Sequence, residues 1–306
     1  MIIYIVETPL QLLCAFEVMR LKNEKRYKLL IRLNGKQEND RQTITMAGQL
    51  GLKYQTVLFR NRFRYIDVLA FFHLLPLSFR KFDTIYYGSL FSNFLSLMSC
   101  LIKSEKEVFL DDGVATFLSS RKVAGKRKSI TLFTFFNLEK SDSITIIPND
   151  FSEVRAFFCV EACRPSTPIF IGQKVVEAGM MSKKNYLSAV LRAQKEAGGE
   201  IDYIPHRDES EATTGTIASM PGVTVIRPDC CIEMYLLKSS LKPSYIASTF
   251  SSALFSLGVL FPDSKREAWL PSTFSTEKVP HYAQIIDGLS NCGVTVKNYN
   301  DSEDDD

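Results

Sequence analysis

The stretch Val108-Phe-Leu-Asp-Asp-Gly-Val-Ala-Thr116 decides the fold that the sequence predicts. A short run of strand-type residues ends at Leu110, and two adjacent carboxylates and a glycine follow it directly. In an open α/β sheet, ligands and chemistry collect beyond the carboxyl ends of the strands. Asp111 and Asp112 are therefore the first candidates for a general base.

Strands and helices alternate around this stretch. Continuous apolar or β-branched runs predict buried parallel strands at 2–6, 28–32, 54–59, 84–87, 107–110, 130–136 and 144–147. Helical periodicity predicts helices at 9–20, 39–50, 65–77 and 91–101. Thr8 and Pro9 suit the N-cap and first turn of the first of these helices. The alternation indicates a doubly wound parallel sheet, and no glycine-rich loop for a nicotinamide cofactor follows the first strand.

A second alternation begins at Pro168, after the segment 164–168 interrupts the periodicity. It predicts strands at 169–172, 201–204, 223–226, 245–247 and 295–299, and helices at 183–197, 231–239 and 253–260. We therefore expect domains at 1–163 and 164–300, followed by a disordered acidic tail at 301–306. Two such halves with a cleft between them form the GT-B arrangement of glycosyltransferases. The expected fold is α/β, with two Rossmann-like domains whose parallel sheets face a central cleft.

The charge of the chain is nearly balanced, at +3 over 306 residues, so it does not indicate a nucleic-acid partner. Cations concentrate at Arg60, Arg62 and Arg64 and in the segment 121–128. These clusters are either solvated loops or a patch that meets anionic lipid headgroups or a phosphorylated glycan.

The seven cysteines form an odd set in mostly apolar runs, which is typical of buried thiols in a reducing compartment. Cys159 and Cys163 have no second pair at zinc-site spacing, so we expect no metal. The segment 1–10 lacks a basic start and contains Glu7, so it is a strand and not a signal peptide. Segment 68–77 is too short to span a bilayer, which needs ~20 apolar residues. We expect a cytoplasmic protein, with a peripheral position on the inner membrane face as the alternative.

Several residues at predicted strand ends are candidates for chemistry. Asp111-Asp112-Gly113 could be a tight turn, a metal-binding pair, or a base whose pKa is raised by its neighbour. His206, after a predicted strand, is either a surface histidine or a donor that stabilises a leaving phosphate.

Four further residues are candidates for donor binding, together with Asp112 and Gly113. Ser251 and Ser252 precede a helix, where hydroxyls either cap the helix or help to hold a phosphate. Glu233 is either part of a solvated helix face or an acceptor for a ribose diol. Gly172, at the end of a predicted strand, is the fourth.

The Asp-Asp-Gly, histidine and Ser-Ser blocks, in this order, resemble the three short motifs of bacterial sialyltransferases. The opening Tyr4-Ile-Val-Glu-Thr-Pro-Leu-Gln-Leu12 resembles the start of glycosyltransferase family 52 and of the related polysialyltransferases. The similarity extends from Met1 to about Leu260. The family usually has His-Pro, whereas here Arg207 follows His206 and Pro205 precedes it.

This resemblance implies a GT-B fold and a metal-independent enzyme that inverts the anomeric carbon of CMP-N-acetylneuraminic acid. Asp111 would be the base, with Asp112 and Gly113 completing its motif. The remaining roles would be stabilisation of the CMP leaving group by His206, phosphate binding by Ser251 and Ser252, and ribose binding by Glu233. The first domain would then be the acceptor side and the second would bind the CMP-sugar.

The acceptor would be a terminal galactoside of a bacterial lipooligosaccharide, O-antigen or capsule. One alternative keeps the fold and uses another CMP-nonulosonate or nucleotide sugar. Another is a non-catalytic GT-B-like protein associated with the membrane. The linkage, the exact acceptor and the oligomeric state, including a homodimer, stay open at this stage.

Overall fold

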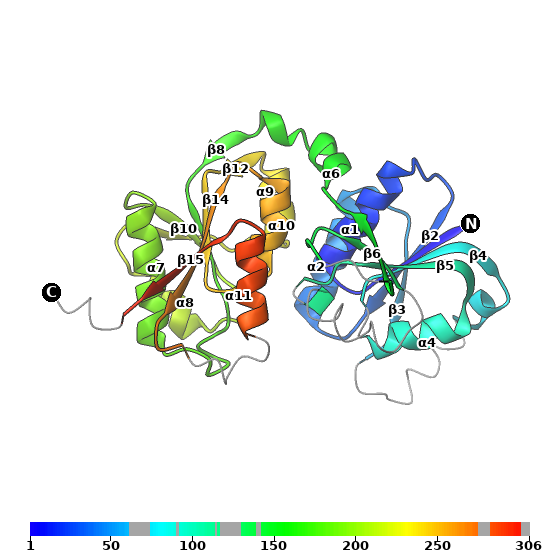
Figure 1. Ribbon diagram of the computed structural model, residues 1–306, viewed down its shortest axis with the longest axis horizontal. Coiled ribbons are helices and arrows are strands. Elements are labelled where there is room, and N and C mark those ends of the chain that lie inside the picture. Colours follow the sequence, from blue (N-terminus) through cyan, green and yellow to red (C-terminus); the bar gives the residue numbers. More distant parts are fainter. Residues whose placement is uncertain are drawn as a thin grey trace. The chain divides into compact units, whose positions relative to one another are not determined.

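The computed structural model describes residues 1–60, 74–89, 92–113, 115–116, 130–138, 142–274 and 282–300. The chain forms two compact units, Met1–Phe157 and Phe158–Asp306 (Figure 1). The division falls six residues before the predicted boundary at 163 (163 − 157 = 6). Each unit is built on its own parallel sheet, and each is described here by itself.

The first unit contains a seven-stranded sheet in the order β3-β2-β1-β4-β5-β6-β7, and all its strand pairs are parallel. Its strands are β1 (Ile2–Val6), β2 (Tyr27–Leu33), β3 (Gln55–Leu58), β4 (Lys81–Tyr87), β5 (Lys103–Leu110), β6 (Ile130–Thr134) and β7 (Ile144–Pro148). Its helices include α1 (Pro9–Leu21), α2 (Gln37–Gln49), α4 (Asn93–Leu101) and α6 (Ser152–Phe157).

The first strand and helix form as the sequence predicts. Residues 3–6 have no exposed surface, as expected of a parallel strand that is covered on both faces. Thr8 is the N-cap of α1, and its hydroxyl accepts a hydrogen bond from Gln11 N at 3.4 Å. Ile3 and Ile5 pack in one apolar cluster with Phe94 of α4, so this helix covers one face of the sheet.

The strand order reverses direction between β1 and β4. From β1 the sheet grows to β2 and β3 on one side and to β4 and β5 on the other. Ligands of open α/β sheets bind at such a switch point, beyond the carboxyl ends of the strands. This edge of the first sheet carries Glu7, Ser89 and the carboxylate pair Asp111-Asp112.

The second unit contains a six-stranded parallel sheet in the order β11-β10-β9-β13-β14-β15. Its strands are β9 (Ile169–Ile171), β10 (Ile201–Ile204), β11 (Val223–Val225), β13 (Tyr245–Ser248), β14 (Lys265–Pro271) and β15 (Thr295–Tyr299). Its helices include α7 (Lys183–Glu196), α8 (Glu211–Ala218), α9 (Ile232–Lys238), α10 (Ala253–Leu260) and α11 (Tyr282–Asn291). The switch point of this sheet lies between β9 and β13.

Some elements differ from the sequence prediction. The segment that we expected to break the periodicity contains a short strand, β8 (Arg164–Ser166), which pairs with β12 (Leu241–Pro243). Helices α8 and α11 and strand β14 were not predicted. The predicted helix at 65–77 lies mostly outside the described residues, as do Arg62, Arg64, the basic segment 121–128 and the acidic tail 301–306.

All seven cysteines are free thiols, but only Cys14 and Cys230 are buried. The prediction of mostly buried thiols is therefore wrong, because Cys100 and Cys159 are exposed and the other three are partly exposed. Within the described part of the chain, no helix combines the length and apolar character needed to cross a bilayer.

Candidate functional site

Asp111 lies at the end of β5 and has no exposed surface. Its carboxylate accepts hydrogen bonds from Thr134 Oγ1 at 2.6 Å and from Phe135 N at 2.8 Å. Burial raises the pKa of Asp111 to about 7, although these hydrogen bonds act in the opposite direction. The side chain thus ties the end of β5 to the end of β6.

Asp112 is partly exposed and makes different contacts. Gln11 Nε2 donates to its Oδ1 at 2.7 Å, and its own backbone N donates to Thr116 Oγ1 at 2.7 Å. Gly113 follows with a φ of 62°, in the left-handed region that glycine tolerates. The tight turn that the sequence suggests is therefore present, and it presents one carboxylate outward while burying the other.

The pKa values of both carboxyls are raised, and burial is the largest cause in each case. We predicted a raised pKa from repulsion between the pair. The direction is right, but the charge of Asp112 contributes less to the shift at Asp111 than burial does. A raised pKa suits a group that must accept a proton near neutral pH.

A pocket of about 370 Å³ lies at this edge of the first sheet. Its lining residues lie at or just after the carboxyl ends of β1 to β5, or at the start of α4: Glu7, Arg32, Phe59, Arg60, Ser89, Ser92, Asn93, Phe94 and Asp112. Ser89, Ser92 and Asn93, which lie between the end of β4 and the start of α4, thus share a pocket with Asp112. Asp112 lines this pocket and Asp111 does not.

In the second unit, His206 follows β10 by two residues and is partly exposed. Asp208 N donates a hydrogen bond to His206 Nδ1 at 3.0 Å. Because Nδ1 accepts, the proton of the neutral ring is on Nε2, which can donate to a ligand. Burial lowers the pKa of His206, and Asp208 partly opposes this shift.

A buried carboxylate holds the backbone of this histidine. Glu209 is 8% exposed, and its Oε2 accepts from His206 N at 3.0 Å. Its Oε1 accepts from Tyr203 OH at 2.5 Å, and Tyr203 OH lies 2.8 Å from Tyr186 OH. Burial raises the pKa of Glu209 to about 7. Sequence reasoning missed Glu209. Its position three residues after His206 is the spacing of a tight turn, in which the side chain can reach back to the backbone of His206.

Gly172 directly follows β9 and packs tightly against the segment that follows β10. Gly172 N donates to Ile204 O at 2.8 Å. A Cβ atom at this position would lie 2.6 Å from Glu209 Oε2 and 2.9 Å from the Cα of Pro205. Only glycine, which has no Cβ, allows this close approach of Glu209 and Pro205, so Gly172 sets the position of the loop that carries His206.

The loop 249–252 between β13 and α10, called the hydroxyl loop after Thr249, Ser251 and Ser252, is bonded to Gln173, just after the end of β9. Gln173 Oε1 accepts from Phe250 N at 2.9 Å and also from the Thr249 hydroxyl. Ser251 Oγ accepts from Ala253 N at 3.3 Å, so it caps the start of α10, whereas the Ser252 side chain makes no capping bond. The predicted Gly172, His206 and Ser251 therefore converge on the switch point of the second sheet.

Glu233 does not belong to a solvated helix face, because only 6% of it is exposed. Ser256 Oγ donates to Glu233 Oε1 at 2.6 Å, which joins α9 to α10. This bond keeps the carboxylate beside the helix that Ser251 and Ser252 begin.

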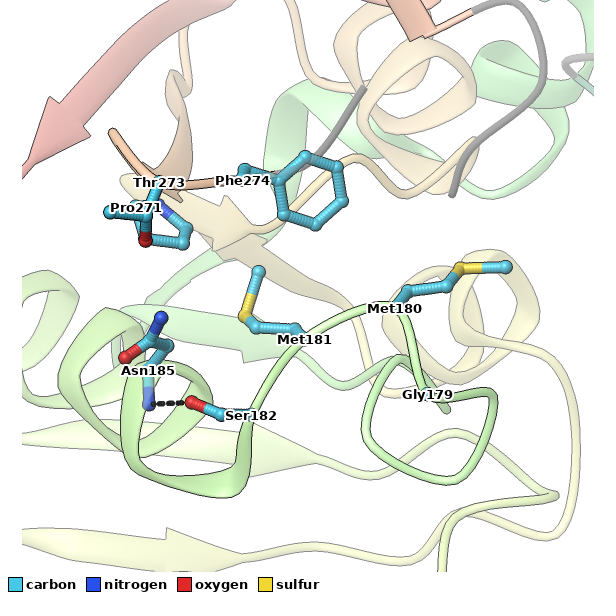
Figure 2. Close-up of a pocket in the computed structure, with 8 residues that line it drawn as sticks. All are labelled: Gly179, Met180, Met181, Ser182, Asn185, Pro271, Thr273 and Phe274. Carbon is cyan, nitrogen blue, oxygen red and sulfur yellow. Dashed lines mark hydrogen bonds between the residues drawn. The ribbon is translucent and has the colours of Figure 1, made fainter. Parts of the chain in front are cut away.

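A second pocket, of about 290 Å³, lies in the same unit (Figure 2). Figure 2 shows Pro271, Thr273 and Phe274 on one side, and the segment 179–185 on the other. Phe274 packs against Phe250 of the hydroxyl loop, with ring centroids 5.6 Å apart. None of the residues predicted for the site lines this pocket.

Among the described residues, no three histidine, cysteine, aspartate or glutamate side chains form a group that could hold a metal ion. Metal independence nevertheless stays a prediction, because it concerns the reaction.

No model of a known protein family matches the chain, and no curated protein sequence matches it. Solved structures do. The UDP-GlcNAc 2-epimerase of Methanocaldococcus jannaschii, in complex with UDP-GlcNAc and UDP, is similar with a TM-score of 0.60 and 10% identity, over 98% of this chain and 89% of that one. The Neisseria meningitidis enzyme bound to UDP-GlcNAc gives 0.57 and 11%, over 98% and 88%. Heptosyltransferase WaaC of E. coli gives 0.54 and 10%, over 97% and 93%.

These similarities and the two parallel, Rossmann-like sheets show that the fold is GT-B, as the sequence predicts. At such low identity they establish the fold alone, and activity has to be argued from the residues.

Proposed function

We propose that the chain is an inverting, metal-independent sialyltransferase. It would move N-acetylneuraminic acid from its CMP-activated form to a terminal galactoside of a bacterial surface glycan. The similar structures have nucleotide sugars among their bound ligands, which supports a nucleotide-sugar donor. The choice of CMP-sialic acid rests on the resemblance of the three short motifs to those of sialyltransferases.

One observation carries the proposal: the candidate donor residues of the second unit converge. Gly172, His206 and Ser251 follow strands β9, β10 and β13, which are neighbours around the switch point. Hydrogen-bond donors at this edge of the sheet can stabilise the phosphate of the nucleotide sugar, which gains negative charge as its bond to the sugar breaks. The proposal thus assigns the donor to the second unit and the acceptor to the first.

The base assignment moves within the carboxylate pair. The resemblance implies Asp111, but this side chain is fully buried and already accepts two hydrogen bonds. Asp112 lines a pocket and is partly exposed. A general base must come within hydrogen-bond reach of the proton that it removes. We therefore propose Asp112 as the base, with Asp111 fixing the turn that presents it.

The reaction follows from these roles. Asp112 takes the proton of the acceptor hydroxyl, and the oxygen forms a bond to the anomeric carbon of the donor. The bond from that carbon to the phosphate oxygen breaks on the opposite face, and its electron pair leaves with CMP. His206 Nε2–H and the Ser251 and Ser252 hydroxyls stabilise the departing phosphate. The product has the inverted anomeric configuration.

Incubation with CMP-N-acetylneuraminic acid and lactose tests the proposal. We expect CMP and sialyllactose in equal amounts. UDP release from UDP-GlcNAc without CMP release would move the assignment to another nucleotide sugar. Binding of the CMP-sugar without turnover would favour the non-catalytic alternative.

The same assay tests the metal prediction. Because side chains handle the charge of the leaving phosphate, we expect the rate after EDTA treatment to equal that of the untreated protein. A loss of activity that Mg²⁺ or Mn²⁺ restores would instead make Asp111 and Asp112 metal ligands.

A further inference from the structure

A buried ion pair that the proposed reaction does not use lies beside Asp112. Glu7 follows β1, Arg32 belongs to β2, and Arg32 Nη1 lies 2.8 Å from Glu7 Oε1. The two side chains are only 11% and 5% exposed. An ion pair at such depth is a poor source of stability, because desolvation of both charges offsets their attraction. Its place in the pocket wall therefore suggests a role in binding.

The carboxylate of Glu7 is held in one orientation. Its Oε1 accepts from Ser92 Oγ at 2.6 Å as well as from Arg32. Arg32 is fixed in turn, because its Nε donates to Phe59 O at 2.7 Å. Glu7 Oε2 accepts no hydrogen bond from any residue that the structure describes. The pocket thus contains a rigid acceptor that still has a lone pair for a ligand.

Asn93 complements this acceptor. It is the first residue of α4, it lines the same pocket, and it is exposed. Its side-chain amide makes no hydrogen bond to the described part of the chain, and it offers both donors and an acceptor. The charged groups of the wall are two carboxylates, of Glu7 and Asp112, and two guanidinium groups, of Arg32 and Arg60. Their charges balance, so the wall suits a neutral ligand rich in hydroxyl groups.

We infer that this pocket holds the terminal neutral hexopyranose of the acceptor. Glu7 Oε2 accepts a hydrogen bond from one ring hydroxyl, Asn93 bonds a neighbouring hydroxyl, and Asp112 lies beside the hydroxyl that attacks. The volume of about 370 Å³ is within the roughly 300–1,000 Å³ of small-molecule sites. The inference rests on the proposed function, since it names the residues, Glu7 and Asn93, that position the acceptor sugar beside Asp112.

Titration of the full-length protein with methyl β-galactopyranoside, followed by ligand-observed NMR, tests this without a donor. Asn93→Ala is the first variant, because the side chain is exposed and its loss leaves no described partner unpaired. We expect about fivefold weaker sugar binding from one lost hydrogen bond. Ser96→Ala, at an exposed position of the same helix, is the matched control and should bind as the wild type does.

Glu7→Gln removes a charged acceptor, so the expected loss of sugar affinity is roughly tenfold to a hundredfold. Because Arg32 then loses its ion pair, a thermal melt must show that the variant is folded; if it is not, Asn93→Ala decides alone. Unchanged galactoside binding in Asn93→Ala and in folded Glu7→Gln overturns the inference. Binding of free N-acetylneuraminic acid as tight as that of the galactoside also overturns it, because the wall would then accept an anion.

The test of the sugar pocket and the test of the proposed donor can fail independently. If the wild type binds the galactoside through Asn93 but neither binds nor turns over CMP-N-acetylneuraminic acid, the donor assignment fails and the sugar pocket stands. If it turns over the donor while both variants bind the galactoside normally, the donor assignment stands and the pocket fails.

Discussion

The two units hold the polar residues at their strand ends in different ways. In the first unit, side chains bond directly to the candidate groups: Thr134 to Asp111, and Gln11 to Asp112. In the second unit, the candidate histidine is held through its backbone by the buried Glu209, which is itself bonded to Tyr203. Chemistry in the first unit should therefore respond to single carboxylates. Chemistry in the second unit should also respond to substitution of residues that touch no substrate.

The largest expected effect comes from the exposed member of the carboxylate pair. Asp112→Asn removes the proposed base, so we expect kcat to fall about 10³-fold, in the range typical of general-base loss. Asp111→Asn should lower kcat about tenfold, because it loosens the turn without removing the proposed base. Initial rates of CMP release with saturating lactose give both values.

Calorimetric titration with CMP should show nearly unchanged affinity in both variants, because the proposal assigns CMP binding to the second unit. Asp142→Asn, at an exposed position of the first unit, is the control for loss of a negative charge. A larger rate loss in Asp111→Asn than in Asp112→Asn would return the base to the buried residue.

A smaller effect is expected in the second unit. His206→Ala removes the Nε2–H that we propose stabilises the leaving phosphate, so we expect about a 10²-fold lower kcat. It should also weaken CMP binding, which distinguishes it from the carboxylate variants. Arg207→Ala, at the exposed neighbouring position, is the control. Full CMP affinity in His206→Ala would remove the histidine from the donor site.

Much of the fold could be predicted from the sequence where local signals and burial agree. Strand β1 is a continuous apolar run, and Thr8-Pro9 marks the start of α1. Strand β14 was missed because it begins Lys-Arg-Glu, which has no strand pattern. Its Glu267 is nevertheless fully buried and accepts from Tyr245 OH at 2.7 Å. Only the tertiary partner explains that burial.

The candidate site was predictable to the same extent. The positions of Asp111-Asp112 and His206 at strand ends followed from the pattern. The pattern did not show which of the two carboxylates is exposed, because that depends on Thr134, which is 23 residues away in the chain. Glu7 and Arg32 were also missed, since they meet only when β1 and β2 pair.

Among the residues that the structure describes, each unit has one buried carboxyl whose pKa is raised to about 7: Asp111 in the first and Glu209 in the second. A carboxyl whose pKa is higher in the folded state binds its proton more tightly there. The free energy of unfolding therefore falls as the pH rises from the unfolded pKa, about 4, to about 7. Between pH 5 and pH 8 we expect a loss of about 2 kcal/mol per group, given 1.36 kcal/mol per pKa unit and some relaxation around the charge.

Urea unfolding at both pH values measures this loss. Asp111→Asn and Glu209→Gln should each remove their own share of it. The change should affect only the unit that carries the substitution if the two units unfold in separate transitions. The same pH dependence in the wild type and in both variants would show that neither carboxyl titrates in this range.

The smallest expected effect tests how the second unit positions its histidine. In Gly172→Ala the new methyl group would meet Glu209 Oε2 and Tyr203 OH at 2.6 and 2.7 Å, so these side chains must move. Overpacking of this kind costs about 1–3 kcal/mol, which should lower the melting temperature by a few degrees. Because Glu209 holds His206 N, CMP affinity should fall as well, although the added methyl group would touch no ligand. Gly215→Ala, where a Cβ meets no atom within 4 Å, is the matched control: it lies inside α8, so it should raise the melting temperature slightly through helix propensity, by about 1 kcal/mol at most, and leave CMP affinity unchanged. A Gly172→Ala protein with a lower melting temperature but unchanged CMP affinity would mean that the buried Glu209 stabilises the unit without positioning the donor site.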